Sequence, residues 1–384
     1  MTTPSAHASG RVLRTLHGDL ELPVFLPDAT RGVVRGLDAD DLRACGIGAL
    51  VVNAFHLQSH PGMNTLRALG GLHAFMHWPG PVMTDSGGFQ VLSLLAGSSK
   101  RGSITKKGVR LRLRDGRDCR LLTPEKCIRH QFMAGADVLV CLDYCTHPAA
   151  PREEQHRSVD FTVLWAAACR QEFDRLVEAT GRRPLLFAVV QGGNDASLRR
   201  ECAERLLEIG FDGYGFGGWP VADGGRLVDM VQFVAGLIPQ AHPRWGLGIG
   251  KPGNLVRAAQ CGYSVFDCTI PTRDARHRRL YAFRSAPEDA PARPDDFCDV
   301  IYMQDDKHRR DARPVDETCD CPCCRNYSRA YLHHLFQVWD PLALRLATMH
   351  NLRFYARLMD GLRKATCVPP SIRRGGLGVD LPAT

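Results

Sequence analysis

The sequence has no long hydrophobic run. Its first ten residues, Met1 to Gly10, are small and polar and lack the apolar core of a signal peptide. No later run approaches the roughly 18 uninterrupted apolar residues that a membrane helix needs. We therefore expect a soluble, cytoplasmic protein with no membrane partner.

A disulfide framework is also missing. The chain has 15 cysteines, an odd number, and many are scattered through apparent strands and helices, as at Cys45, Cys141, Cys169, Cys202 and Cys268. A small secreted protein stapled by disulfides has a different pattern. Most of these thiols are expected to be reduced and buried.

Strong charge of one sign is absent as well. The net charge is +8 and the pI is about 8.8. This balance is compatible with a polyanionic partner, but it falls short of the strongly basic signature of a dedicated nucleic-acid binder. A mildly basic metabolic enzyme would have the same charge.

The length and the apolar content favour one large domain with an appendage. The chain has 384 residues, of which 44% are hydrophobic and 23% are charged, and these fractions are ordinary for a globular protein. A (β/α)₈ barrel of about 250 residues plus a lobe of roughly 100 would account for the length.

One pattern repeats from about residue 47 to residue 270: a short apolar run, a polar or glycine-rich stop, and a helix-like stretch. Such repeats are typical of a parallel sheet covered on both faces. The runs are Ala49 to Val52, Pro81 to Met83, Val138 to Leu142, Leu185 to Val190, Tyr214 to Phe216, Trp245 to Ile249 and Ser264 to Phe266.

Seven or eight such units favour an α/β fold of the (β/α)₈ TIM-barrel type. A doubly wound sheet is the alternative, but no Gly-x-Gly-x-x-Gly turn follows an early strand. The opening segment, Gly10 to Arg35, has the alternation of an antiparallel hairpin, which could cap one end of the barrel.

The pattern changes after about residue 280. Residues Ser285 to Asp296 are rich in Pro, Ala and acidic groups and predict an exposed linker or loop. Two helices are predicted beyond it, over Asn326 to Val338 and Pro341 to Lys364; Asp340 and Pro341 suit the start of the second. In the first helix, Tyr331, Leu335, Phe336 and Trp339 fall at helical spacing.

We predict a barrel with its cap over residues 1–284, a zinc-binding helical subdomain over 285–368 and a flexible tail over 369–384.

A cysteine cluster gives the strongest local signal. Cys319, Cys321 and Cys324 follow one another closely, and His350 lies 26 residues after the last of them. Three thiolates and one imidazole complete a tetrahedral zinc site with no open position, so we predict one structural Zn²⁺ per chain. A metal-free group of buried thiols is the alternative, and Cys323 leaves the ligand set open by one residue.

Polar residues follow the ends of the predicted strands. In barrels the active site lies where the carboxyl ends of the strands meet. The residues in question are Asp85, Asp143, Gln191, Gly217, Gly218, Gly248 and Asp267. A single aspartate at such a position is often only a helix cap, but three around one rim indicate a site.

Two of these aspartates suit a displacement at a sugar anomeric carbon. Of Asp85 and Asp267, one would attack to give a covalent sugar–enzyme intermediate, while the other handles protons on the leaving and arriving base. The small residues after Asp85 let a ligand approach the backbone, and Phe89 offers a face for a flat base. Gln191 offers a donor and an acceptor to a purine-like edge.

A basic strip follows Asp267. Guanidinium groups beside a reactive carboxylate are suited to holding phosphates of a nucleic-acid strand, although a solvated helix face would look the same. The strip consists of Arg273, Arg276, His277, Arg278 and Arg279.

Together these motifs resemble the tRNA-guanine transglycosylase family of bacterial type. The matching segments are TDSGGFQ (84–90), VQGG (190–193), FDCTIPTR (266–273), CDCPCCRNYSRAYLHHL (319–335) and HNL (350–352). They stand in the family's order and spacing, and the resemblance extends from about residue 10 to residue 365.

The resemblance implies a role for each site residue. Asp267 would be the nucleophile that expels guanine from the target guanosine of tRNA, and Asp85 the general acid/base, supported by Ser86. The residues implied to hold the free deazaguanine base are Asp143, Gln191, Gly217, Gly218 and Gly248, with Phe89 and Leu247 against its faces. Arg273 and Arg276 would contact the anticodon loop, and the family's homodimer is implied as well.

Four departures from the family pattern concern base choice and RNA docking. Trp219 and Pro220 follow the glycine pair where the family usually has Leu and a small residue, and Ala222-Asp223 replaces Gly-Glu. Leu247 replaces a usual methionine, and the strip at residues 276–279 is more basic than usual. Cys145 and Val221 match the bacterial pocket, which takes preQ1 (7-aminomethyl-7-deazaguanine); queuine is the alternative base.

Two rival functions remain open at this stage. A non-catalytic partner subunit is expected to lack the nucleophile and parts of the pocket, yet Asp85, Asp143, Gln191 and Asp267 are all present. A DNA-directed deazapurine transferase is favoured by the changed basic strip and disfavoured by the zinc segment, which matches the tRNA enzymes.

Overall fold

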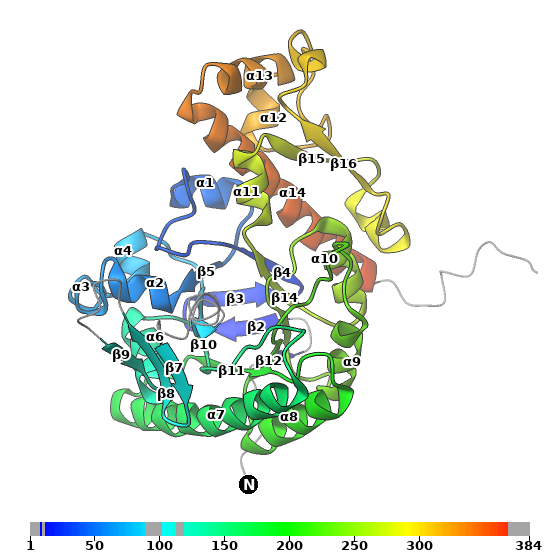
Figure 1. The fold of residues 1–384 in the computed structure, drawn as a ribbon. Helices are drawn as coiled ribbons and strands as arrows, with labels where there is room; N and C mark the ends of the chain where they lie inside the picture. Colours follow the sequence, from blue (N-terminus) through cyan, green and yellow to red (C-terminus); the bar gives the residue numbers. More distant parts are fainter. Residues whose placement is uncertain (1–7, 10–11, 89–101, 113–118, 368–384) are drawn as a thin grey trace, which may run out of the picture.

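The chain folds around an eight-stranded parallel barrel (Figure 1). The computed structural model describes residues 8–9, 12–88, 102–112 and 119–367. Around the sheet the strands run β4, β14, β13, β12, β11, β10, β6 and β5. A parallel bridge between Asp28 and Val51 joins the two end strands and closes the ring. The strands are β4 (Val24–Pro27), β5 (Leu50–Asn53), β6 (Val82–Asp85), β10 (Val138–Val140), β11 (Leu185–Val190), β12 (Gly213–Phe216), β13 (Arg244–Gly246) and β14 (Val265–Cys268).

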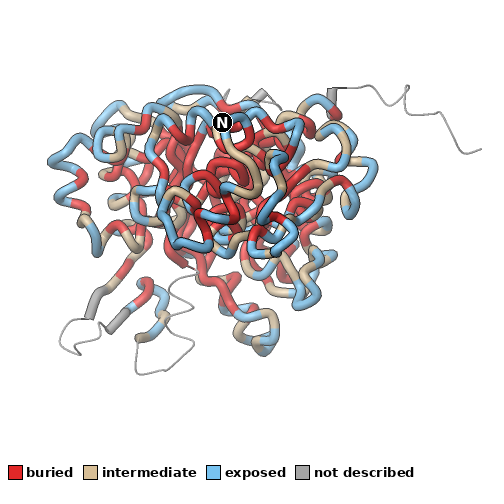
Figure 2. Tube along the Cα trace, turned by 90° about the horizontal axis from the view of Figure 1, so that it is seen from above, coloured by how far each residue is buried: buried red, intermediate tan, exposed pale blue. Residues whose placement is uncertain are grey.

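The barrel strands are continuous apolar runs because both of their faces are covered. All residues of β4, β5, β10, β11 and β12 are buried, as expected for parallel strands between a packed interior and a ring of helices. Viewed from above, the buried residues gather inside a rim of exposed ones (Figure 2). The predicted barrel is confirmed.

Helices form the outer layer. In the described residues between β4 and the end of α11, the helices are α1 (Ala39–Ala44), α2 (Ala54–Ser59), α3 (Met63–Ala68), α4 (Gly71–Met76), α6 (Pro124–Ala134), α7 (Arg152–Thr180), α8 (Ala196–Ile209), α9 (Asp229–Leu237), α10 (Pro252–Gln260) and α11 (Ile270–Arg276). Side-chain caps such as Asp195 on α8 and Thr123 on α6 fix where several of these helices begin. No helix in the described part of the chain is long and apolar enough to cross a membrane.

An antiparallel sheet caps the amino-terminal end of the barrel, but it is shorter than predicted. It contains β1 (Ala8–Ser9), β2 (Val12–Thr15) and β3 (Gly18–Glu21). Leu13 and Leu20 belong to the same buried cluster as the first residues of β10 and β14, and His17 in the turn contacts buried Asp137 at 2.7 Å. Residues 24–27, expected within the hairpin, instead form the first barrel strand, which pairs in parallel with β14.

A second antiparallel sheet was not predicted. It consists of β7 (Gly102–Thr105), β8 (Gly108–Arg112) and β9 (Cys119–Leu122) and lies between β6 and α6 in the chain. Val109 and Leu122 join the main core and anchor this sheet to the barrel.

The carboxy-terminal lobe follows the barrel. Its elements are β15 (Arg279–Phe283), the 3₁₀ helices η2 (Pro287–Ala292) and η3 (Asp306–His308), β16 (Cys298–Tyr302), α12 (Pro322–Asn326), α13 (Arg329–Gln337) and α14 (Pro341–Cys367). The segment expected to be an exposed linker contains η2, which packs on α14 through buried Ala290. Its alanines and prolines therefore serve packing as well as connection.

Helix α14 belongs to both parts of the molecule. Its first turns contribute Leu346 and Ala347 to the core of the lobe, whereas Phe354 and Leu358 lie in the main barrel core. The hydroxyl of Tyr355 donates to the carbonyl of Gly250 at 2.6 Å. The helix thus fixes the lobe onto the barrel beside β4 and α11.

Candidate active site and metal centre

A cavity of about 520 Å³ opens at the carboxyl ends of the barrel strands. Three aspartates line it, Asp85 from the end of β6, Asp143 after β10 and Asp267 on β14. Of the other residues that the sequence singled out, its walls contain Ser86, Gly217, Gly218, Leu247, Gly248 and Arg273. The parallel strands therefore gather polar groups distant in sequence into one place.

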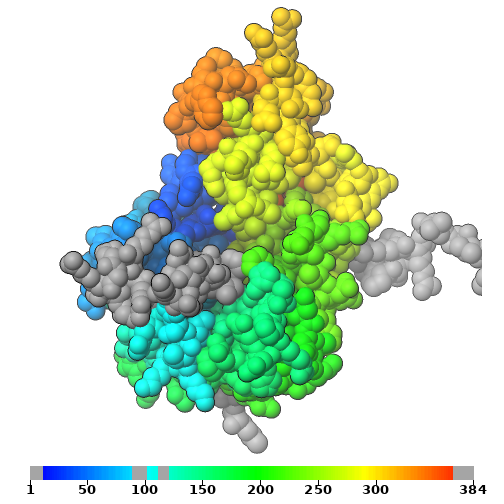
Figure 3. Space-filling model, viewed as in Figure 1, coloured from blue at the N-terminus to red at the C-terminus, as the bar shows by residue number. Residues whose placement is uncertain are grey.

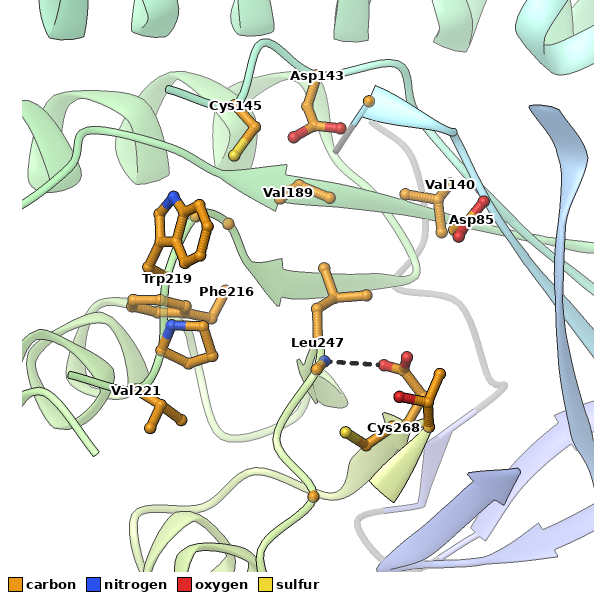
Figure 4. A pocket seen from close by; sticks show the side chains of 18 of the residues that line it. Asp85, Val140, Asp143, Cys145, Val189, Phe216, Trp219, Val221, Leu247 and Cys268 are labelled. Carbon is orange, nitrogen blue, oxygen red and sulfur yellow. Dashed lines mark hydrogen bonds between the residues drawn. The ribbon is translucent and has the colours of Figure 1, made fainter. Parts of the chain in front are cut away.

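Asp267 is held by two hydrogen bonds to the same carboxylate oxygen. The indole Nε1 of Trp245 donates to Oδ1 at 2.8 Å, and the backbone N–H of Gly248 donates to it at 3.2 Å (Figure 4). Burial raises the pKa of Asp267 to about 6, while these two donors oppose the rise. Both donors bind Oδ1, so the second oxygen, Oδ2, is available to react. With a pKa of about 6, the carboxylate is ionised at neutral pH. The hydrogen bond from Trp245 was not predicted from the sequence.

Asp85 has a different environment. The side-chain amide of Asn53, at the end of β5, donates to its Oδ2 at 2.7 Å. Its Oδ1 is buried and has no hydrogen-bond partner among the described residues. Burial, followed by the nearby charge of Asp267, raises the pKa of Asp85 to about 8. At neutral pH, Asp85 is therefore protonated while Asp267 is ionised.

Asp143 is fixed by its neighbours. Nε2 of Gln191 donates to one carboxylate oxygen at 2.7 Å, and the hydroxyl of Ser86 donates to the other at 3.0 Å. Ser86 therefore supports Asp143 rather than Asp85, contrary to expectation. Gln191 is only 1% exposed and lies behind Asp143 rather than on the cavity wall.

The glycines of the wall leave room for these side chains. A Cβ on Gly88 would lie 2.6 Å from a carboxylate oxygen of Asp143, and one on Gly217 would lie 2.4 Å from Nε2 of Gln191. Gly218 has φ +93°, a conformation that other residues rarely adopt. At these positions glycine is required by close approach and by backbone shape.

The ends of the cavity differ in character. Phe216 and Trp219 lie at one end and Asp85 lies at the other, with Leu247 between them (Figure 4). The ring of Trp219 also meets that of His147 edge to face at 5.6 Å. Phe89, the second predicted stacking residue, lies outside the described residues.

A cluster of arginines borders the cavity. Arg273 lies on the wall, and the pKa of Arg276 is lowered first by burial and then by the nearby charges of Arg35 and Arg273. Within the described part of the chain, no carboxylate forms an ion pair with any of these three guanidinium groups. The charge of Asp28 offsets part of this repulsion, and like charges held together without an ion pair suit an anionic ligand. Arg35 was not predicted.

The four predicted metal ligands converge in the lobe. One ligand atom each from Cys319, Cys321, Cys324 and His350 lies within 4.8 Å of the others. Nδ1 of His350 faces the thiols, 3.2 Å from Sγ of Cys324, and its Nε2 donates to the carbonyl of Tyr281 at 2.6 Å. Such an outer contact orients metal-bound imidazoles. Three thiols and an oriented imidazole, all buried or nearly so, fit a structural metal ion, and Cys323 is not part of the set.

The fold and the site define a class of protein. It is a (β/α)₈-barrel enzyme whose cavity contains an ionised and a protonated carboxyl group and has Arg273 on its wall.

Comparison with known proteins identifies the family. The family model described as queuine tRNA-ribosyltransferase matches residues 8–367. A queuine tRNA-ribosyltransferase of Shewanella halifaxensis is 40% identical over 365 residues, which cover 95% of this chain and 91% of that protein. One from Psychrobacter cryohalolentis is 38% identical over 351 residues, or 91% and 87% of the two chains. The chain belongs to the queuine tRNA-ribosyltransferase family.

Proposed function

We propose that this protein exchanges the wobble guanine of tRNAs with a GUN anticodon for a 7-deazaguanine, through a covalent intermediate on Asp267. Guanine exchange in tRNA, the pentosyltransferase reaction of queuosine synthesis, is the activity of its family. The observation that carries the catalytic part is the pair of carboxyl groups in one cavity, Asp267 with its pKa near 6 and Asp85 with its pKa near 8.

Asp267 acts as the nucleophile. Its free carboxylate oxygen attacks C1′ of the guanosine ribose, and the bond from C1′ to N9 breaks with its electron pair going to the base. Trp245 and Gly248 hold the other oxygen and so keep the attacking oxygen in place. The product is a ribosyl ester of Asp267.

Asp85 moves the proton. In the first half-reaction it donates its proton to the leaving guanine, and in the second it takes the N9 proton of the arriving deazaguanine as N9 attacks C1′ and releases Asp267. A pKa near 8 suits both directions at neutral pH. The Oδ1 of Asp85, which has no hydrogen-bond partner among the described residues, is available to carry that proton.

The base is read at the other polar groups of the cavity. Asp143 and the backbone at Gly217, Gly218 and Gly248 offer acceptors and donors to its edge, and Gln191 fixes the orientation of Asp143. Leu247, with Phe89 from outside the described residues, would cover the ring faces. Cys145 and Val221 lie on the wall, and with Trp219 they favour the small aminomethyl group of preQ1 over the bulkier queuine.

Zn²⁺ is the metal that the donor set favours. Three thiolates with one imidazole match tetrahedral zinc, which at a site with four protein ligands has a structural role. The metal would fix α12 to α14 and so hold the lobe in shape. None of the catalytic steps involves it.

The nucleic acid and the second subunit complete the proposal. Arg273 and Arg276 hold phosphates of the anticodon loop, with Arg35 beside them.

The exposed side chain of Tyr331, stacked on Tyr327 at 5.2 Å, offers an apolar contact to a second copy in a homodimer. Because the substrate is tRNA, we place the reaction in the cytoplasm.

The test is incorporation of radiolabelled guanine into tRNA with a GUN anticodon, with duplex DNA as a parallel substrate and with preQ1 or queuine as a competitor. We expect labelled tRNA, unlabelled DNA, and stronger competition by preQ1. Labelled DNA alone would favour the DNA-directed enzyme. A folded, metal-loaded protein that labels neither substrate would favour the non-catalytic subunit.

A further inference from the structure

Among the described residues, three helices are followed by a left-handed residue with a large side chain: His77 after α4, and two residues that lie close together. Arg278 follows α11 with φ 61°, and Trp339 follows α13 with φ 58°. Glycine is usual at such positions because a Cβ is disfavoured there. Trp339 was expected on the apolar face of the helix, but α13 ends at Gln337 and the ring lies beyond it.

The backbone around both residues is held by hydrogen bonds. The N–H of Arg278 donates to Ala275 and its carbonyl accepts from Met303, at 3.0 and 2.9 Å. On the other side of Trp339, the N–H of Asp340 donates back to the carbonyl of Leu335 at 3.0 Å. The conformation of both residues is therefore fixed by their surroundings.

The two side chains meet. The guanidinium carbon of Arg278 lies 4.9 Å from the ring centre of Trp339 and 5.7 Å from that of Phe336. Phe336 is buried, but Trp339 is 82% exposed, more than any other large hydrophobic side chain of the described residues. Arg278 covers part of the indole, and the rest of the ring faces solvent.

Helix α11 connects Arg278, and with it Trp339, to the catalytic cavity. Helix α11 begins just after Asp267, carries Arg273 on the cavity wall, and ends two residues before Arg278. Seven helical residues span about 10 Å, which is the length of about three stacked nucleotides. Residues of this segment lie on the surface between the barrel and the orange lobe (Figure 3).

We propose that Trp339 and Arg278 form a platform on which an unpaired base of the tRNA strand stacks, a few nucleotides from the exchanged guanosine. This inference rests on the proposed function. Indole rings stack on bases of any sequence, and arginine adds attraction for the adjoining phosphate. Arg273 on the cavity wall, Arg276 and Arg278 follow one another along this segment between the cavity and the ring, and this order of cationic side chains favours RNA over a second copy of the chain.

Fluorescence quenching tests the contact directly. Of the five tryptophans, Trp78, Trp165 and Trp245 are buried, and Trp219 is less exposed than Trp339. We expect an anticodon stem-loop RNA to protect a large fraction of the fluorescence from acrylamide in the wild type. Most of that protected fraction should be lost in Trp339→Phe, which leaves Trp219 in the cavity as the exposed tryptophan.

Kinetics separate a binding role from a structural one. We expect Trp339→Ala to raise the KM for tRNA about 10-fold without changing kcat or the KM for guanine, and Trp339→Tyr to restore most of the loss. Arg278→Gly, which suits the left-handed backbone, should raise the same KM without lowering Tm. Val338→Ala, at an exposed neighbouring residue (56%), is the matched control and should change nothing.

Each outcome decides the proposal. If the wild type modifies tRNA while Trp339→Ala keeps the wild-type KM and RNA fails to protect Trp339, the platform is wrong and the proposed function stands. If Trp339→Ala instead changes the oligomeric state measured by light scattering, the ring belongs to an interface between copies. If the wild type neither binds nor modifies tRNA, both proposals fail.

Discussion

Asp85 and Asp267 show how one cavity gives two carboxyl groups different protonation states. Both pKa values are raised by burial, but Asp267 receives two hydrogen bonds on one oxygen, whereas Asp85 also experiences the charge of Asp267. The difference suits a nucleophile that is ionised beside an acid that is still protonated.

The first prediction concerns pH. Asp267 must be ionised and Asp85 protonated when tRNA binds, so kcat/KM for tRNA should rise through about pH 6 and fall through about pH 8. Asp85→Asn should remove the alkaline fall together with most of the activity. A flat profile between pH 5 and pH 9 would contradict these assignments.

The second prediction concerns Trp245. Removing the indole N–H in Trp245→Phe should raise the pKa of Asp267 by about one unit, because a hydrogen bond to a charged group contributes about 1.5–3 kcal/mol. The acid limb should move to higher pH while the alkaline fall near pH 8 stays in place, so the pH range of activity should narrow from its acid side. Phe187→Leu is the control, since the ring of Phe187 packs on Trp245 at 6.3 Å without contacting the carboxylate. An equal shift in the control would assign the effect to packing.

Among single residues, the sequence predicted the polar side chains at the strand ends but not the residues that contact them. Asp85, Asp143 and Asp267 could be assigned to one rim because parallel strands of a barrel place their carboxyl ends together. Asn53, Trp245 and Arg35 could not, because each is defined by a contact with a strand or loop distant in sequence. By residue type alone, Asn53 is equally typical of a helix cap, Trp245 of a hydrophobic core and Arg35 of a solvated surface.

Among the elements, the buried parallel strands were the easiest to predict. Seven of the eight appear as apolar runs, whereas β4 was assigned to the hairpin because Val24–Pro27 directly follows the alternating residues of β3. The sheet of β7, β8 and β9 was missed because its short strands mix polar and apolar residues, as in GSIT and GVRLR. Such segments look like loop until their packing partner is known.

Helix α14 couples the metal centre to the catalytic barrel. His350 lies between the turns that pack in the lobe and those that pack on the barrel, and its Nε2 bonds to Tyr281 in β15. Disorder at the metal site would therefore reach α11, which packs on α14 and carries Arg273 and Arg276.

The third prediction follows from this coupling. Cys324→Ser should reduce the metal content from about one zinc per chain to nearly none, lower Tm, and weaken tRNA binding more than guanine binding. Elemental analysis and calorimetry give the first two values. Cys323→Ala is the matched control, since its buried thiol lies outside the ligand set. Loss of metal in the Cys323 variant alone would show that the ligands are misassigned.

On the scale of the whole molecule, a modest net charge of +8 conceals a local concentration of unpaired arginines. Composition averages the chain, so it could not indicate a nucleic-acid site, whereas the fold brings Arg35 beside Arg273 and Arg276. The division into a barrel and a lobe at residue 285 stays a prediction; α14 belongs to the second part by sequence but packs in the cores of both.

The fourth prediction uses salt. If Arg276 holds a phosphate of single-stranded RNA, Arg276→Ala should reduce the slope of log affinity for tRNA against log salt concentration by about 0.7. Arg313→Ala is a suitable control because Arg313 is already paired with Asp311 at 2.8 Å. An unchanged slope for Arg276→Ala would place the RNA elsewhere.

The most direct test of the central claim is covalent capture of the substrate. Wild-type protein incubated with tRNA of a GUN anticodon should give a denaturation-resistant protein–RNA adduct, which free deazaguanine discharges into modified tRNA. Asp267→Asn should form no adduct, and its exchange of labelled guanine should fall by about 10³-fold or more, because an amide is a poor nucleophile. An adduct or rapid exchange by Asp267→Asn would show that another residue attacks the ribose.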